Sequence, residues 1–167
     1  MARATVTDRV DVSLVIAAPP ERVLRSFFDS QALAAWWQAM RSVTSPRVLG
    51  PYVVEWRPTE FRDDLLGRLG GILRGTVMEI NPRQGFFLAD VYWLPPDSDP
   101  IGPMALNVSC VPAPWPLASM ESAPETATQV RILQSGCDQS ARWRRFYQLF
   151  GPGWERALGT LKGLLEH

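Results

Sequence analysis

The C-terminal part of the chain carries apolar side chains at intervals of three or four positions, with polar residues between them. The members of this stripe are Trp143, Phe146, Tyr147, Phe150, Trp154, Ala157, Leu158, Leu161, Leu164 and Leu165. Such spacing predicts a long helix with one apolar face. The stripe keeps its phase across Gly151-Pro152-Gly153, where a helix would ordinarily break. A helix face so rich in aromatic rings must lie on a broad apolar surface, which the upstream sequence has to supply.

Most of the upstream sequence distributes its apolar residues in the way that strands do. From Val6 to Ile16, apolar and polar side chains alternate, which predicts a half-buried strand. Further strands are expected over 41–48, 52–57, 72–80, 86–93, 104–111 and 127–134. Prolines interrupt the pattern at 94–103 and 112–126, which predicts loops because proline cannot donate to a strand ladder.

Two short helices are expected between the first two strands. Pro20 and Glu21 suit the first turn of a helix over 20–28, because proline presets the backbone there and glutamate favours the positive end of the helix dipole. Ser30 suits the N-cap of a second helix over 31–38.

The remaining segments and the chain length complete the predicted organisation. The segment 58–71 is expected to be a polar loop with a short helical turn near 63–69. With 167 residues, the chain is most simply a single domain over 1–167. Residues 165–167, with the sequence Leu-Glu-His, are either native or the remnant of an expression tag.

Composition and charge exclude several classes of function. Seventeen basic residues balance seventeen acidic ones, and no basic block is present, so no nucleic-acid partner is expected. No apolar run is long enough to span a membrane and no signal core precedes the first strand, which favours a cytoplasmic location. Cys110 and Cys137 do not make a disulfide framework, so both thiols are expected to be reduced.

The residues that usually carry metal or cofactor chemistry are scarce. His167 is the only histidine and stands at the end of the chain, which excludes a histidine-based triad and zinc sites with histidine ligands. No cluster has the spacing of metal ligands, and the glycines of 67–71 lack the spacing of a nucleotide-binding loop. No metal and no cofactor are therefore expected.

Four stretches, in order along the chain, carry a resemblance to a known superfamily. They are 16–23 (IAAPPERV), 34–37 (AAWW), 75–82 (GTVMEINP), and Gly153-Trp154 with the leucine-rich helix that follows. The chain resembles the SRPBCC superfamily, also called START-like or birch-pollen-allergen-like helix-grip proteins. It looks most like the branch related to the activator of the ninety-kilodalton heat-shock protein's ATPase. The proline-rich insertion at 112–126 and Cys137 depart from that branch near the expected pocket rim, so its ligand range does not carry over.

The resemblance implies an α+β helix-grip fold and a cavity. In that fold, a curved antiparallel sheet of about six to seven strands wraps around a long C-terminal helix, with two short helices after the first strand. A cavity is expected between sheet and helix, and the side chains expected to line it are Trp37, Tyr52, Trp56, Phe86, Leu88, Tyr92, Trp143, Tyr147 and Trp154. The alternative is that these rings pack against one another and fill the core.

A small set of charged residues are the candidates for chemistry in that cavity. Asp90 interrupts an apolar strand and, with strict alternation, shares a face with Phe86, Leu88 and Tyr92. A buried carboxylate costs several kcal/mol unless it is paired or protonated. Arg74 is a candidate partner on the neighbouring strand, and Glu55 with Arg57 offers a second pair. These groups are either a polar anchor or acid–base site inside the cavity, or cross-strand salt bridges on a solvated face.

Three functions remain open at this point. The favoured one is non-covalent binding of a small hydrophobic or amphipathic ligand. The first alternative is an enzyme of the polyketide cyclase, dehydratase or hydrolase kind, in which Asp90, Arg74, Tyr92 or Glu55 positions a substrate and transfers protons. The second is a chaperone-associated or other protein-interaction module, with Trp115 and Leu117 as the contact surface. The activators carry a further chaperone-binding domain that is not expected here, which disfavours a chaperone partner. A homodimer through exposed strand edges or through Trp115 stays open.

Overall fold

Seven antiparallel strands form one curved sheet in a computed structural model that describes residues 9–113, 127–136 and 140–167. Their order is β1-β9-β8-β7-β6-β3-β2. Their bounds are β1 (Arg9–Ile16), β2 (Arg41–Thr44), β3 (Pro51–Trp56), β6 (Gly71–Asn81), β7 (Gly85–Leu94), β8 (Ile101–Pro112) and β9 (Thr128–Ser135). Each neighbouring pair is antiparallel, so the predicted type of sheet is confirmed.

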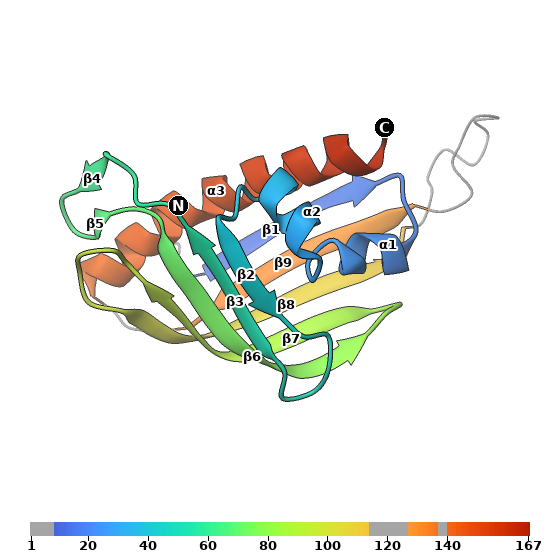
Figure 1. The fold of residues 1–167 in the computed structure, drawn as a ribbon, viewed down its shortest axis with the longest axis horizontal. Helices are drawn as coiled ribbons and strands as arrows, with labels where there is room; N and C mark the ends of the chain where they lie inside the picture. Colours follow the sequence, from blue (N-terminus) through green and yellow to red (C-terminus); the bar gives the residue numbers. More distant parts are fainter. Residues whose placement is uncertain (1–8, 114–126, 137–139) are drawn as a thin grey trace, which may run out of the picture.

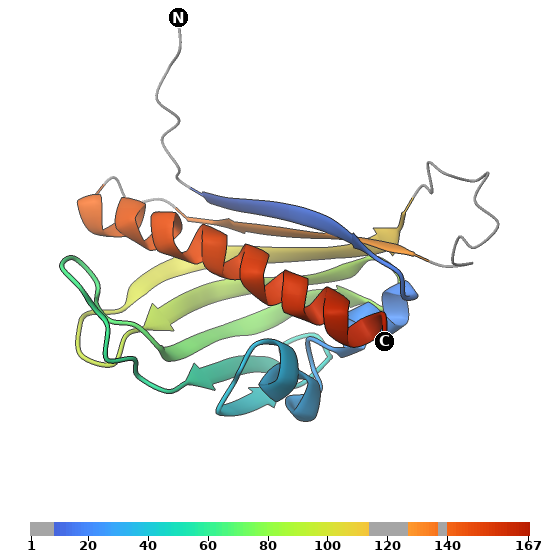
Figure 2. The same cartoon turned by 90° about the horizontal axis from the view of Figure 1, so that it is seen from above.

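Helices lie on one face of this sheet. The long helix α3 (Ala141–Leu165) crosses the concave face, and the sheet curves around it (Figures 1 and 2). The short helices α1 (Pro20–Arg25) and α2 (Ser30–Trp36) connect β1 to β2 and lie near the C-terminal end of α3 (Figure 2). The predicted α+β arrangement, with two short helices after the first strand, is therefore confirmed.

The helix α3 forms as the apolar stripe predicts, except that Leu164 is exposed. The Oγ of Ser140 caps it by accepting a hydrogen bond from the amide of Trp143 at 3.3 Å. Its buried side chains are Phe146, Tyr147, Trp154, Ala157, Leu158, Leu161 and Leu165. Pro152 lies inside the helix without ending it. Pro152 and Gln148 are both exposed, so water can satisfy the Gln148 carbonyl that lacks its usual amide partner.

The C-terminal end of α3 is fastened to the connection between β1 and α1. The Oε2 of Glu166 accepts hydrogen bonds from the Ala17 amide at 2.8 Å and from the Lys162 Nζ at 2.6 Å. The Arg22 Nη1 donates to the Leu165 carbonyl at 3.1 Å. The ammonium of Lys162 is the main cause that lowers the pKa of Glu166. These contacts give the end of the helix a fixed position against the sheet edge.

Several local predictions were wrong at element boundaries. The Oδ2 of Asp29, rather than Ser30, caps α2 by accepting from the Ala32 amide at 3.1 Å. The strand expected over 41–48 ends at Thr44, since the chain turns there and Leu49 adopts a left-handed φ of 66°.

The helical turn expected near 63–69 is a small hairpin instead, formed by β4 (Arg62–Asp63) and β5 (Gly67–Arg68). The reason is that the Oδ2 of Asp63 accepts from the amides of Leu65 and Leu66, at 3.0 and 3.1 Å. These bonds hold a tight turn, and Gly67 follows it with a φ of 78°.

The β4–β5 hairpin is held against α3 by a buried carboxylate. The Asp63 Oδ1 lies 2.7 Å from the Arg145 Nε, and the Asp63 side chain is only 4% exposed. Burial alone would raise the pKa of Asp63, but the hydrogen bonds from Arg145 and from the two turn amides outweigh it, so the pKa is lowered. The hairpin therefore has a fixed place beside the first turns of α3.

We expect Asp63→Ala to lower the free energy of unfolding by about 2 kcal/mol at neutral pH, because it leaves Arg145 and two turn amides without their acceptor. Urea denaturation measures this loss. The matched control is Asp11→Ala, which breaks a pair with Arg131 of the same 2.7 Å length whose side chains are 34% and 49% exposed. That exposed pair should contribute less than about 1 kcal/mol. Equal losses in both variants would contradict the assignment of Asp63 as the stronger contact.

The Asp63 contribution should also depend on pH. Its folded-state pKa lies below the ordinary value of 3.8, so the folded protein binds the proton less readily than the unfolded chain. The stabilisation is therefore complete above that value and is lost as the pH falls through the folded pKa. Denaturation of the native protein and of Asp63→Ala across the acid range should show their difference shrinking. A difference that is constant into strong acid would contradict this origin.

Candidate functional site

A cavity of about 760 Å³ lies between α3 and the sheet, beside the connection from α2 to β2. Segments far apart in sequence surround it. Its lining residues are Ala34, Trp37, Gln38, Ala39, Met40, Trp56, Arg57, Thr59, Gly70, Leu73, Trp93, Gln134, Phe150, Gly153 and Trp154. Gln38, Met40, Arg57 and Thr59 are exposed, so the cavity opens to solvent on their side.

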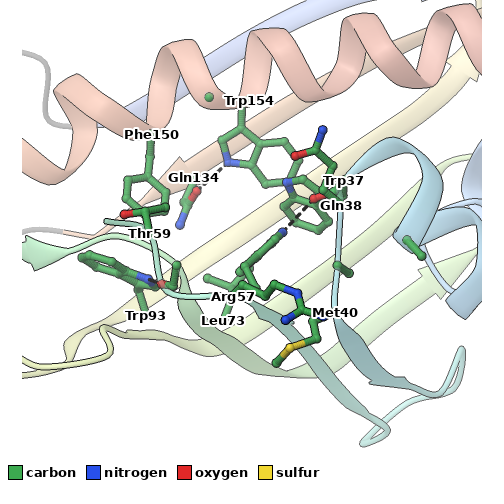
Figure 3. A pocket seen from close by; sticks show the side chains of 15 residues that line it. Trp37, Gln38, Met40, Arg57, Thr59, Leu73, Trp93, Gln134, Phe150 and Trp154 are labelled. Atoms are coloured by element: carbon green, nitrogen blue, oxygen red, sulfur yellow. Dashed lines mark hydrogen bonds between the residues drawn. The ribbon is translucent and has the colours of Figure 1, made fainter. Parts of the chain in front are cut away.

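Aromatic rings form two groups in the lining. The ring of Trp37 lies 5.0 Å from that of Trp56 and 4.7 Å from that of Trp154, between centroids. The ring of Trp93 lies 4.9 Å from that of Phe150. Figure 3 shows Trp93 and Phe150 on one side of the view and Trp37 and Trp154 on the other, with Gln134 between them. The cavity thus lies between flat apolar walls, and α3 contributes to both of them.

The walls are held in place by hydrogen bonds from the indole nitrogens. The Trp56 Nε1 donates to the Trp37 carbonyl at 2.8 Å, and the Trp93 Nε1 donates to the Gly70 carbonyl at 2.8 Å. The Trp154 Nε1 donates to the Gln134 Oε1 at 2.9 Å (Figure 3). Because each of these rings has a fixed partner at its polar edge, each presents its apolar surface to the cavity.

Two polar side chains of the lining differ sharply in burial. Gln134 is 1% exposed and comes from β9, at the back of the cavity. Arg57 is exposed, follows β3 at the open side, and is the only charged residue of the described lining. None of the ion pairs among the described residues includes Arg57. The cavity therefore has a neutral polar group deep inside and a positive charge at its mouth.

Solved structures with the same architecture are found by comparison. No protein-family model and no curated protein sequence matches the chain. Protein MLL2253 from Mesorhizobium loti is 23% identical, with a TM-score of 0.62, over 95% of this chain and 96% of that one. The Aha1 dimer from Colwellia psychrerythraea is 17% identical, with a TM-score of 0.57, over 95% and 96% of the two chains. DynU16, from the dynemicin biosynthetic locus, is 18% identical, with a TM-score of 0.58, and this chain covers 47% of its length.

The chain has a helix-grip fold. These neighbours share this architecture, so the resemblance noted in the sequence is confirmed at the level of the fold. At the identities found, the likeness carries no ligand or activity over to this chain. None of the described helices is long and apolar enough to cross a lipid bilayer. Among the described residues, no group of three or more His, Cys, Asp or Glu side chains could hold a metal ion.

The helix grip brings together only some of the residues expected to contact a ligand. Trp37, Trp56 and Trp154 line the cavity. Phe86 and Leu88 are buried in the core and do not line it.

Of the four other expected aromatic residues outside the lining, Tyr52, Tyr147 and Trp143 contact other parts of the protein. The Tyr52 hydroxyl donates to the Phe27 carbonyl at 2.7 Å, and burial raises the pKa of Tyr52 well above its ordinary value. The Tyr147 hydroxyl donates to the Gly136 carbonyl at 2.9 Å. Trp143 packs against Tyr147 at the start of α3. The backbone, rather than a ligand, therefore accepts from both tyrosine hydroxyls.

A β-bulge in β7 explains why Tyr92 and Asp90 do not face the cavity. The pairing of β7 with β8 shifts register between Leu88 and Val91, and Asp90 adopts a left-handed φ of 53°. The extra residue reverses which side chains point inward beyond it. Val91 and Trp93 are therefore buried, while Asp90 is exposed. The expectation that Asp90 and Tyr92 share the inner face with the residues before them was wrong for this reason.

The other charged candidates also lie outside the lining. Arg74 is exposed, and its guanidinium carbon lies 5.0 Å from the centre of the Tyr92 ring. Glu55 pairs with Arg41 at 3.0 Å across β2 and β3, rather than with Arg57. Asp90, Arg74 and Glu55 are thus surface or cross-strand residues, and the structure does not bring them together.

Among the cavity residues that were not singled out as ligand contacts from the sequence, four bear on how a ligand is recognised. Phe150 belongs to the α3 stripe, and Trp93 became an inward residue only through the bulge. Arg57 was considered only as a partner for a carboxylate. Gln134 had the clearest unused signal, because it continues the inward series of β9 at a position where that series is otherwise mostly apolar.

Substitutions at Asp90 test the bulge. Asp90→Val should lower the free energy of unfolding by about 1–2 kcal/mol, because a β-branched residue is strained at a left-handed φ. Asp90→Gly should be neutral or slightly stabilising. Gln129→Val, at an exposed and regularly paired position of β9, is the control and should cost little. Urea denaturation of the three variants measures these changes. If Asp90→Val lowers the free energy of unfolding no more than Gln129→Val does, the strained geometry at Asp90 is contradicted.

Proposed function

We propose that the protein binds a small amphipathic molecule, without covalent chemistry, in the cavity beneath α3. The observation that carries this proposal is the space of about 760 Å³ between aromatic walls. Small-molecule sites have volumes of about 300–1,000 Å³ and mostly apolar linings with few polar groups. Burial of the apolar part of a ligand would drive binding, at about 25 cal/mol per Å² of surface removed from water. Trp37, Trp56 and Trp154 would contact that part.

The lining favours binding over turnover. The described residues around the cavity include no carboxylate, thiol or imidazole, so the side chains that most often transfer protons or attack a substrate are absent from it. The enzymatic alternative requires that Asp90, Arg74, Tyr92 or Glu55 face this space, and none of these four residues lines it. Cys110 is buried in the core, where burial raises the pKa of its thiol to about 12.

The charge at the mouth favours a neutral or anionic ligand. Tryptophan faces alone would also attract a cation such as a quaternary ammonium. Arg57 stands at the open side without a carboxylate in the described lining to offset it, so a cation would meet a like charge there. The expected ligand is therefore apolar in its body and neutral or negative at its outer end.

A protein-interaction role has less support from the described residues. Trp115 and Leu117, its expected contact surface, lie outside the residues that the structure describes. A chaperone partner therefore stays a prediction. A homodimer also stays a prediction, which the dimeric Aha1 neighbour supports only as an analogy of fold.

Filling the cavity should abolish binding. In Gly153→Trp, an indole would occupy the space, since a Cβ at position 153 meets no heavy atom closer than 3.9 Å. We expect the affinity for 2-acetylnaphthalene to fall at least about ten-fold by isothermal titration calorimetry, a loss of about 1.4 kcal/mol or more.

The control for this variant is Gly159→Trp on the exposed face of the same helix, where a Cβ meets nothing within 4 Å. Both substitutions replace a helical glycine and should preserve or improve helix stability. Only the substitution at position 153 should weaken binding. Equal affinities in the two variants would place the binding site elsewhere.

The charge preference can be tested with a matched pair of probes. We expect 2-naphthylacetate to bind more tightly than 2-naphthylmethylammonium, and added salt to narrow the difference. Arg57→Gln should reduce the preference several-fold, because it removes the charge at the mouth. Arg47→Gln, an exposed arginine outside the lining, makes the same change in net charge and should leave the preference intact. A preference for the ammonium probe would contradict the assigned ligand charge.

A further inference from the structure

Gln134 occupies a position where the fold calls for an apolar side chain. On β9, the side chains of Thr128, Val130, Ile132 and Gln134 alternate toward the helix and are all buried. Thr128 satisfies its hydroxyl by donating to the Ala18 carbonyl at 2.6 Å. Gln134 is the long polar member of this series, and it is the one that lines the cavity.

The orientation of the Gln134 amide is fixed by its neighbour on α3. The Trp154 Nε1 can only donate a hydrogen bond, so the amide oxygen of Gln134 must be the atom that faces it, at 2.9 Å. The Gln134 Nε2 is thereby turned away from Trp154. An amide flip would set two donors against each other and is unfavourable.

The Nε2 group has fewer acceptors than hydrogens. It carries two N–H bonds, and its only acceptor among the described residues is the Met104 Sδ at 3.4 Å. A thioether sulfur is a weak acceptor. A buried N–H without an acceptor is unfavourable, so native proteins rarely leave one unpaired unless a ligand or water completes it.

We infer that Gln134 determines the specificity of the cavity by donating from Nε2 to an oxygen atom at the inner end of the ligand. This inference rests on the proposed function, and it narrows the ligand to molecules with a carbonyl or comparable oxygen acceptor at that end. Solvent in the free cavity can accept this hydrogen bond. A ligand without an oxygen at that end displaces the solvent and leaves the N–H unpaired, whereas a ligand with one replaces the bond.

A pair of nearly isosteric probes isolates this interaction. 2-Acetylnaphthalene carries a carbonyl oxygen where 2-isopropenylnaphthalene carries a methylene group. The two differ in hydration, so the ratio of their dissociation constants is compared between the native protein and Gln134→Met, which keeps a side chain of similar length. The difference in hydration cancels in this comparison. We expect the preference for the ketone to fall about ten-fold in the variant, equivalent to about 1.4 kcal/mol.

A second measurement needs no substitution, which matters because Gln134→Met also removes the acceptor of the Trp154 indole. In the native protein labelled with nitrogen-15, the side-chain amide protons of Gln134 should move downfield when 2-acetylnaphthalene binds. They should not do so with 2-isopropenylnaphthalene. This comparison tests whether the Gln134 Nε2 donates to the ligand oxygen even if the Gln134→Met variant fails to fold.

The outcomes separate the inference from the proposed function. A fall in the ketone preference, or the ketone-specific shift where the variant does not fold, supports the role of Gln134. Binding of both probes with an unchanged preference and no such shift would overturn that role and leave the cavity as a binding site. Failure of both probes to bind the native protein would overturn the proposed function and the inference together.

Discussion

The cavity follows from a mismatch of widths between one helix and a curved sheet. A helix with its side chains is about 10–12 Å across. Seven strands, spaced about 4.8 Å apart, span roughly 30 Å. A single helix therefore cannot cover the concave face, even though burial of its apolar stripe is the main gain from packing there. The short helices α1 and α2 cover part of the remainder, and the cavity lies where α3, the α2–β2 connection and the far strands do not close on one another.

The elements of this arrangement were predictable because each depends mainly on its own sequence. The α3 stripe fixes the helix, its length and the face that it buries, from Phe146 to Leu165. The β-bulge at Asp90 was not predictable by the same reasoning, because alternation assumes that every residue of a strand is paired. A polar residue within an apolar strand was a visible signal, and strict alternation placed it on the same face as Tyr92, either inside the cavity or on a solvated face. The left-handed backbone at Asp90 reverses the interpretation and brings Trp93, instead of Tyr92, to the cavity.

The lining was only partly predictable because it is assembled from many segments. Large rings such as Trp37 and Trp154 could be named from the sequence, since most tryptophan side chains in this fold lie in the core or in the cavity wall. Which of the two applies depends on partners that only the folded structure provides. Tyr52 illustrates this, because its hydroxyl has a backbone acceptor at Phe27 and its ring lies in the core. Residues in connections, such as Met40, follow no periodicity and leave no pattern to read.

Hydrogen bonds within the aromatic walls of the cavity leave few polar atoms that can select a ligand. The indole nitrogens of Trp56, Trp93 and Trp154 are all engaged with the protein, so these rings offer a ligand contact surface but no polar selection. The donors left to the described lining are therefore few, and they differ in depth, with Gln134 buried and Arg57 exposed. A symmetric apolar molecule would gain nothing from that difference. A molecule with an oxygen at its inner end and a neutral or negative outer end would be oriented by it, because reversing the molecule would give up the inner hydrogen bond.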